Sequence, residues 1–208
     1  MNTRIYAIAG MLAPAIFLIT YLIMSISRPE YSNFTKAISE LGSVDAPNKL
    51  YWNFFGYIIP GLLIVLFSLG LKKHFQNTPG KVPFIALALS GFFMAMAGVF
   101  PGDFDNKASL TSTLHAIGSF GSYIAFLVAA FTFPKLLSYV DKWENLRNPL
   151  YLLTFGSFLF GTWPFIFTSM PSIGQRFVFA CYFGWVLLCA FSLYACSKRK
   201  TMQQNFSQ

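Results

Sequence analysis

Residues 5–26, which read IYAIAGMLAPAIFLITYLIMSI, carry no charged side chain and are bounded by Arg4 and Arg28. A helix needs about 20 apolar residues to cross the ~30 Å hydrocarbon core of a bilayer, and this run is long enough. The apolar part of a signal peptide is shorter, about 7 to 15 residues. The stretch therefore predicts a transmembrane helix that is retained in the protein.

Five more apolar runs follow, at residues 51–71, 82–100, 114–137, 150–169 and 177–197. The chain of 208 residues is 55% hydrophobic and only 11% charged, whereas a soluble domain is about 25% charged. A mean hydropathy of +0.56 agrees with this. We therefore predict an all-α, polytopic membrane protein. Residues 1–208 would form a single transmembrane domain, a bundle of six transmembrane helices.

The polar segment between the first two runs, residues 27–49, contains a short amphipathic pattern. Phe34, Ala37, Ile38 and Leu41 recur at helical spacing, with polar residues on the opposite face, and Gly42 is a suitable end point. This pattern predicts a short helix lying in the membrane interface, within the first outer loop.

The charged residues are divided unequally between the two sides of the predicted bundle. With the N-terminus inside, the inner segments carry ten of the 15 basic residues and two of the seven acidic ones. The outer segments hold five of each sign and are neutral. The positive-inside rule therefore predicts a multi-pass protein of the cell inner (cytoplasmic) membrane with both termini cytoplasmic. The ten inner basic residues are Arg4, Lys72, Lys73, Lys81, Lys135, Lys142, Arg147, Lys198, Arg199 and Lys200.

Several classes of function are disfavoured by the same residues. The basic residues lie between apolar runs rather than in one patch, which argues against nucleic acid as a partner.

Cys181, Cys189 and Cys196 share one predicted helix, about 10 to 12 Å apart along its axis, so they cannot form disulfides with each other. His74 and His115 fall on opposite sides, so no bis-histidine haem fits, and one outer histidine is a poor zinc site. We expect no metal and no cofactor.

Unusual polar residues gather at the outer ends of the predicted spans. Because their segments reach one membrane depth, these side chains could line one outward-facing pocket. Arg176 would bind a phosphate or carboxylate. We therefore expect a binding site for a lipid headgroup or a small amphiphilic ligand, with membrane lipids as partners. Its residues are Glu40 in the first loop, Asp103 after the third run, His115 in the first turn of the fourth predicted helix, and Arg176 before the sixth.

Two other interpretations of these residues remain open. In a membrane-embedded lipid-modifying hydrolase or transferase, His115 would be the general base, Asp103 would orient it and Ser39 would be the nucleophile. Alternatively, Glu40 and Asp103 cap helices or pair with Arg176, and the chain is a structural or assembly partner of another membrane protein. The sequence alone leaves the choice between an enzyme and a binding protein undecided.

Short motifs follow one another in a fixed order on the six-span frame. They are Tyr31-Ser32, Ile38-Ser39-Glu40-Leu41-Gly42, Phe100-Pro101 followed by Asp103, His115, and Gly174-Gln175-Arg176. In these motifs the chain resembles the bacterial and archaeal membrane proteins grouped as domain of unknown function 998, over nearly its whole length. The resemblance implies a six-helix membrane domain but no particular activity. It also favours one site composed of Ser39, Glu40, Asp103, His115 and Arg176.

Overall fold

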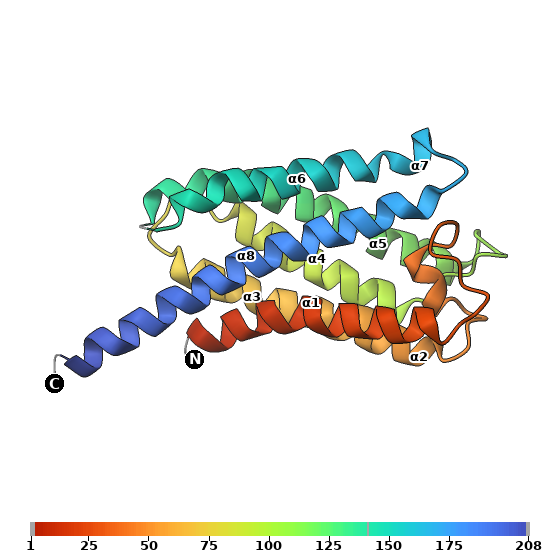
Figure 1. The fold of residues 1–208 in the computed structure, drawn as a ribbon, viewed down its shortest axis with the longest axis horizontal. Helices are drawn as coiled ribbons and strands as arrows, with labels where there is room; N and C mark the ends of the chain where they lie inside the picture. Colours follow the sequence, from red (N-terminus) through yellow and green to blue (C-terminus); the bar gives the residue numbers. More distant parts are fainter. Residues whose placement is uncertain (1–2, 141, 207–208) are drawn as a thin grey trace.

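Six long helical spans lie side by side in the computed structural model, which describes residues 3–140 and 142–206 (Figure 1). The spans are Thr3–Ile26, Lys49–His74, Val82–Val99, Leu110–Tyr139, Glu144–Ile166 and Pro171–Lys198. Within the described residues there is no strand. All six spans are long and apolar enough to cross a membrane, so the prediction of an all-α, six-helix, multi-pass membrane protein is confirmed.

The spans differ in how they are built. The first, third and sixth are the single helices α1 (Thr3–Ile26), α4 (Val82–Val99) and α8 (Pro171–Phe206). The second joins α2 (Lys49–Tyr51), the π-helix η2 (Trp52–Ile58) and α3 (Ile59–His74). The fourth joins α5 (Leu110–Thr132) and the 3-10 helix η3 (Phe133–Tyr139). The fifth joins the 3-10 helix η4 (Glu144–Leu146), α6 (Arg147–Gly161) and the short α7 (Trp163–Ile166).

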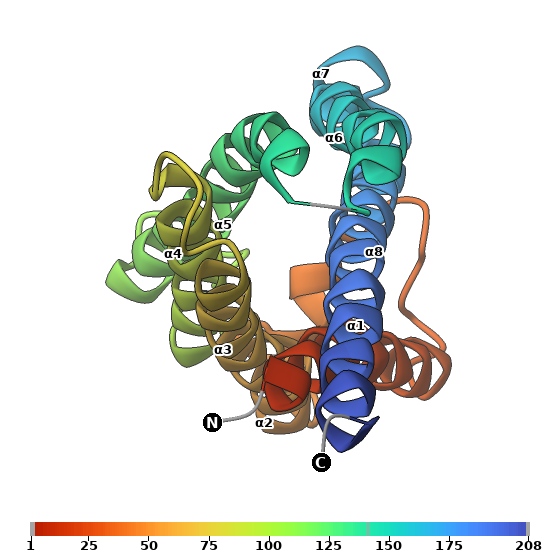
Figure 2. The ribbon, with the colours of Figure 1, turned by 90° about the vertical axis from the view of Figure 1, so that its left-hand side faces the viewer.

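The bundle has two distinct ends and two sides. We call the end where α1 begins and α8 finishes the terminal end, and the opposite end, with residues 27–48, 100–109 and 167–170, the loop end (Figure 1). Figure 2 looks along the bundle from the terminal end. Helices α3, α4 and α5 form one side, α6 and α8 form the other, and α1 contacts both α3 and α8. Helices α5 and α6 make few contacts with each other.

The first loop contains a short helix, as predicted, but the helix covers fewer residues than the amphipathic pattern from Phe34 to Leu41. It is the 3-10 helix η1 (Ile38–Gly42). Ala37 before it has an extended backbone, with φ −64° and ψ 150°, so no helix can run through from Phe34. Ile38 and Leu41 are buried, whereas Phe34 is 61% exposed. The periodic pattern therefore overestimates the helix by about one turn.

The second span is irregular immediately before Pro60. Proline lacks an amide hydrogen, and its ring crowds the carbonyl four residues earlier. In η2 the hydrogen bonds reach back five residues instead, as from the Ile59 amide to the Phe54 carbonyl. The wider π-turn thus accommodates the proline that follows it.

Small residues bring α3, α4 and α5 into backbone contact. A methyl group added to Gly91 of α4 would lie 2.5 Å from the Gly61 carbonyl oxygen and 2.9 Å from the Val65 amide nitrogen, both on α3. One added to Gly118 of α5 would lie 2.7 Å from the Ala97 amide nitrogen on α4. Helices in lipid associate largely through such close packing. Helix α4 therefore packs closely against α3 on one side and α5 on the other, and neither contact has room for a side chain larger than glycine at these positions.

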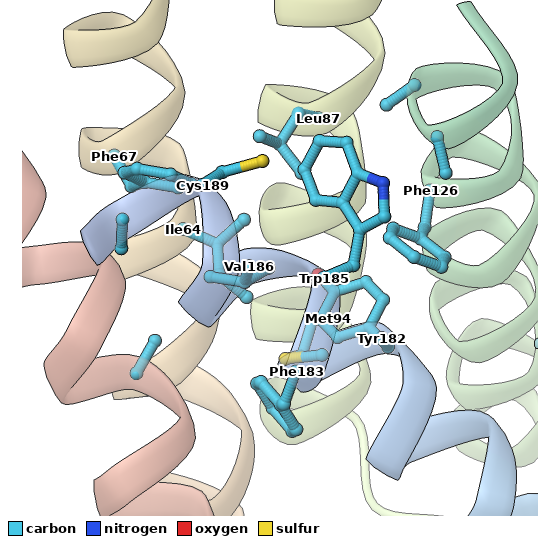
Figure 3. Close-up of a cluster of buried hydrophobic side chains, with 14 of the residues drawn as sticks. Ile64, Phe67, Leu87, Met94, Phe126, Tyr182, Phe183, Trp185, Val186 and Cys189 are labelled. Carbon is cyan, nitrogen blue, oxygen red and sulfur yellow. The ribbon is translucent and has the colours of Figure 1, made fainter. Parts of the chain in front are cut away.

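The sixth span supplies side chains that fill the centre of the bundle. In Figure 3, Tyr182, Trp185, Val186 and Cys189 of α8 lie among side chains of α3, α4 and α5. All four are buried. The Phe126 ring of α5 packs edge-on against Tyr182 and Trp185, with ring centroids 4.3 and 5.9 Å apart. Helix α8 thus joins the α3–α4–α5 side to α6, which it also contacts.

We expect Gly91→Ala to destabilise the protein by about 2 kcal/mol, because the new methyl group must push α3 and α4 apart. Gly184→Ala is the matched control, since its methyl group would meet Leu153 at an ordinary 3.5 Å. Thermal unfolding of both variants in one detergent tests this. Equal melting temperatures for the two variants would contradict the assigned α3–α4 contact.

Candidate functional site

A cavity of about 450 Å³ opens near the loop end. It lies between α4 and α5 on one side and α6, α7 and α8 on the other, beneath part of the first loop. This is the region in which α5 and α6 diverge, and the Tyr123 hydroxyl bridges them by donating to the Ser157 carbonyl at 3.1 Å. The cavity therefore follows from the way the two sides of the bundle separate.

The cavity wall combines aromatic rings with neutral polar groups. Its aromatic residues are Tyr57, Phe120, Tyr123, Phe179 and Tyr182, and its polar ones include Thr35, Ser119, Ser122, Ser172 and Gln175. Glu40 is the only Asp, Glu, Lys, Arg or His among the lining residues in the described part of the chain. Phe120 is 66% exposed on α5, so the wall reaches the outer surface of the bundle.

Glu40 belongs to the roof of the cavity, which consists of Thr35, Ala37 and Glu40. Its Oε1 accepts a hydrogen bond from the Ala37 amide at 2.7 Å, which fixes the carboxylate at the start of η1. The second carboxylate oxygen has no hydrogen-bond partner among the described residues, and it is not enclosed. Arg28 donates to the Glu40 backbone carbonyl at 3.1 Å and pairs with Glu30 at 2.6 Å.

Arg176 lies in the second turn of α8 and holds the first loop in place. The sequence places it before the sixth helix, but the helix begins at Pro171, a residue well suited to a first turn. No carboxylate lies within salt-bridge distance of Arg176 among the described residues. Its guanidinium donates instead to neutral oxygens. These are the hydroxyls of Tyr21 at 3.0 Å and Tyr31 at 2.8 Å, the Asn33 amide oxygen at 3.2 Å, and the carbonyls of Lys36 at 3.1 Å and Ser172 at 2.8 Å.

Tyr31 extends this network to the start of η1. Its hydroxyl donates to the Ala37 carbonyl at 3.0 Å, and burial raises the pKa of Tyr31, so the phenol stays neutral beside Arg176. The neighbouring Gln175 makes a second connection, because its Oε1 accepts from the Ile38 amide at 2.8 Å. Two consecutive residues of α8 therefore anchor the segment that carries the roof.

His115 lies in the second turn of α5 rather than the first, because the helix is capped at Ser109. Its Nδ1 lies 2.9 Å from the carbonyl oxygens of both Ala97 and Phe100, at the end of α4. Two acceptors require a proton on Nδ1, and in the neutral imidazole Nε2 then accepts from the Ser119 hydroxyl, 3.4 Å away. His115 thus satisfies carbonyls that the end of a helix leaves open. A role as general base stays a prediction.

Asp103 and Ser39 lie at the same end of the bundle but outside the cavity wall. The Asp103 carboxylate accepts from the Asn106 amide at 2.8 Å within its own turn, and it makes no hydrogen bond to His115 among the described residues. Ser39 is buried in η1, with 8% of its surface exposed. Their proposed roles as orienting residue and nucleophile also stay predictions.

The five predicted residues thus occupy one end of the bundle in two groups. Ser39 and Glu40 lie in the first loop, which Arg176 holds, and Glu40 alone of the five lines the cavity in the part of the chain described. His115 and Asp103 belong to the junction between α4 and α5. The Val44 amide joins the two groups by donating to the Gly102 carbonyl at 3.0 Å. The structure does not bring the five side chains together around a single point.

Sequence reasoning missed most of the cavity wall. Gln175 was detectable, because it stands in the Gly174-Gln175-Arg176 motif. Ser172, Tyr123 and Phe120 had no comparable signal, since hydroxyl and aromatic residues are ordinary components of membrane helices. Their participation depends on the divergence of α5 and α6.

Groups that could hold a metal ion are scarce in the described residues. No three His, Cys, Asp or Glu side chains come together there. Cys181, Cys189 and Cys196 are free thiols. The cavity instead offers one carboxylate, an amide, hydroxyls and aromatic faces.

We expect Arg176→Ala to loosen the first loop, at a cost of about 3 kcal/mol, because charge-assisted hydrogen bonds are lost and their acceptors are left unpaired. Lys107→Ala removes an exposed loop-end charge and serves as the control. Hydrogen exchange of residues 31–38 measures the effect. Protection in Arg176→Ala equal to that in Lys107→Ala would show that the network is dispensable.

The chain was compared with known protein families. The model described as "Protein of unknown function (DUF998)" matches residues 11–193. That match includes four spans completely, most of the first and sixth, and every residue of the cavity wall. No curated protein and no solved structure matches the chain. The chain therefore belongs to the DUF998 family of membrane proteins.

Proposed function

We propose that this protein binds a lipid headgroup or a small amphiphile in the loop-end cavity. The single observation that carries the proposal is a cavity of about 450 Å³ whose wall joins polar groups of the roof to an apolar side reaching the outer surface of the bundle. Pockets that bind small molecules typically measure about 300 to 1,000 Å³ and are mostly apolar with a few placed polar groups. The wall described above has this composition.

In this proposal the amphiphile lies with its polar end toward the roof. Its polar end would lie under the roof, near Glu40, Ser172 and Gln175. Its apolar end would lie against Phe120 and Phe179 and extend between α5 and α6 toward the bilayer. Entry from the bilayer would spare the apolar chain a passage through water.

In this proposal the loop end faces away from the cytoplasm of a cell whose inner membrane holds the protein. The support is the distribution of charge, because ten of the 15 basic residues lie toward the terminal end or in its tails. Basic residues favour the cytoplasmic side of a membrane. The cavity would then receive ligands from the outer leaflet.

The predicted site residues take different roles in this proposal. Glu40 would contact the ligand directly. Arg176 would act as a positioning residue, since its donors hold the first loop and therefore the roof. His115 and Asp103 would stabilise the α4–α5 junction beside the cavity.

We expect Val178→Trp to reduce retained ligand at least about tenfold, because Val178 lines the cavity and the larger ring would fill it. Ala180→Trp places the same ring on an exposed position of α8 and serves as the control. Mass spectrometry of purified protein after exhaustive detergent exchange measures co-purifying lipid or amphiphile. Equal retention by wild type and Val178→Trp would refute binding in this cavity.

A further inference from the structure

We infer that the cavity selects a cationic amphiphile, whose ammonium group pairs with the Glu40 carboxylate while its apolar part lies among the aromatic rings. This inference rests on the proposed function and specifies its ligand class. It follows from three properties of the cavity: its charge, its rings and the fixed position of Glu40.

The charge of the wall is negative. Within the described residues, Glu40 is the sole lining residue with a charged side chain. The two nearby guanidinium groups do not line the cavity, and neither pairs with the Glu40 carboxylate, although Arg28 donates to the Glu40 backbone carbonyl at 3.1 Å. Arg28 pairs with Glu30 at 2.6 Å, and its guanidinium holds the pKa of that carboxyl below the ordinary value. Arg176 donates to neutral oxygens of the loop and helices and does not line the cavity.

The rings of the wall suit a cation as well as an apolar chain. Phe120, Phe179, Tyr57, Tyr123 and Tyr182 contribute aromatic surface. Two of the phenols have polar partners within the protein, since Tyr123 donates to the Ser157 carbonyl and Tyr182 contacts the Ser90 hydroxyl at 3.0 Å. Aromatic faces attract ammonium groups, and combinations of rings are a recurrent means of binding them.

Glu40 is positioned before any ligand arrives. Its Oε1 is held by the Ala37 amide, and the next residue, Ile38, is anchored to Gln175 on α8. The second carboxylate oxygen is therefore presented without reordering of the loop, which reduces the entropic cost of binding. An anionic ligand would meet this carboxylate with no cationic side chain in the wall to compensate it.

The test compares three probes of nearly equal shape: 4-phenylbutylamine, 4-phenylbutanol and 4-phenylbutanoate. At neutral pH they are cationic, neutral and anionic. Equilibrium dialysis against the full chain in dodecyl maltoside gives their dissociation constants. We expect wild type to bind the amine at least about tenfold more tightly than the alcohol, and the anion most weakly.

Glu40→Gln removes the charge but keeps an oxygen that can accept from the Ala37 amide. We expect it to abolish the preference for the amine, so that the amine and the alcohol bind this variant with similar affinity. Asp45→Asn is the matched control, because Asp45 is an exposed carboxylate of the same loop that does not line the cavity. This variant should keep the full preference for the amine.

The outcomes separate this inference from the proposed function. Equal binding of amine and alcohol by wild type, with both lost in Val178→Trp, would overturn cation selection and leave the cavity as a binding site. An amine preference that persists in Glu40→Gln would also overturn it. If no probe binds, or if Val178→Trp binds all three like wild type, both the inference and the proposed function fail.

Discussion

The loop end of this protein depends on one half-buried guanidinium. Arg176 has no carboxylate within salt-bridge distance among the described residues, so neutral oxygens must replace the water that its charge would otherwise bind. Those oxygens come from α1, the first loop and α8, segments far apart in the sequence. Their convergence fixes the first loop on α8. The roof of the cavity, with Glu40 at its edge, has a defined position as a consequence.

The cavity itself depends on how closely the helices can approach one another. In lipid there is little hydrophobic force between helices, so close packing has to supply the attraction. Gly91 and Gly118 allow α3, α4 and α5 to touch through their backbones. Helices α5 and α6 make few contacts, and the Tyr123 hydroxyl bridges them instead. Space therefore remains between the closely packed α3–α4–α5 side and α6. Residues of α8 form part of the wall of this space.

Sequence reasoning succeeded where one physical quantity dominates. The six spans were predictable because uncharged length decides which segments cross a membrane. The short helix of the first loop was predictable in position, although extended backbone at Ala37 shortens it. The apolar runs place the starts of α5 and α8 too late, because a helix continues beyond its apolar run wherever capping and tertiary contacts support it. Those contacts put Arg176 and His115 one turn further into their helices than expected.

The amino-acid sequence thus determined the membrane class, the number of spans, the family resemblance and the end of the bundle at which the unusual polar residues gather. Uncharged length and charge distribution are local properties that need no knowledge of packing. Only the tertiary structure decided that His115 binds the carbonyls at the end of α4, that Arg176 anchors a loop, and that Glu40 faces a cavity lined by Phe120 and Tyr123. Hydrogen-bond partners and cavity walls come from segments distant in the chain, and their meeting depends on the packing of all six helices.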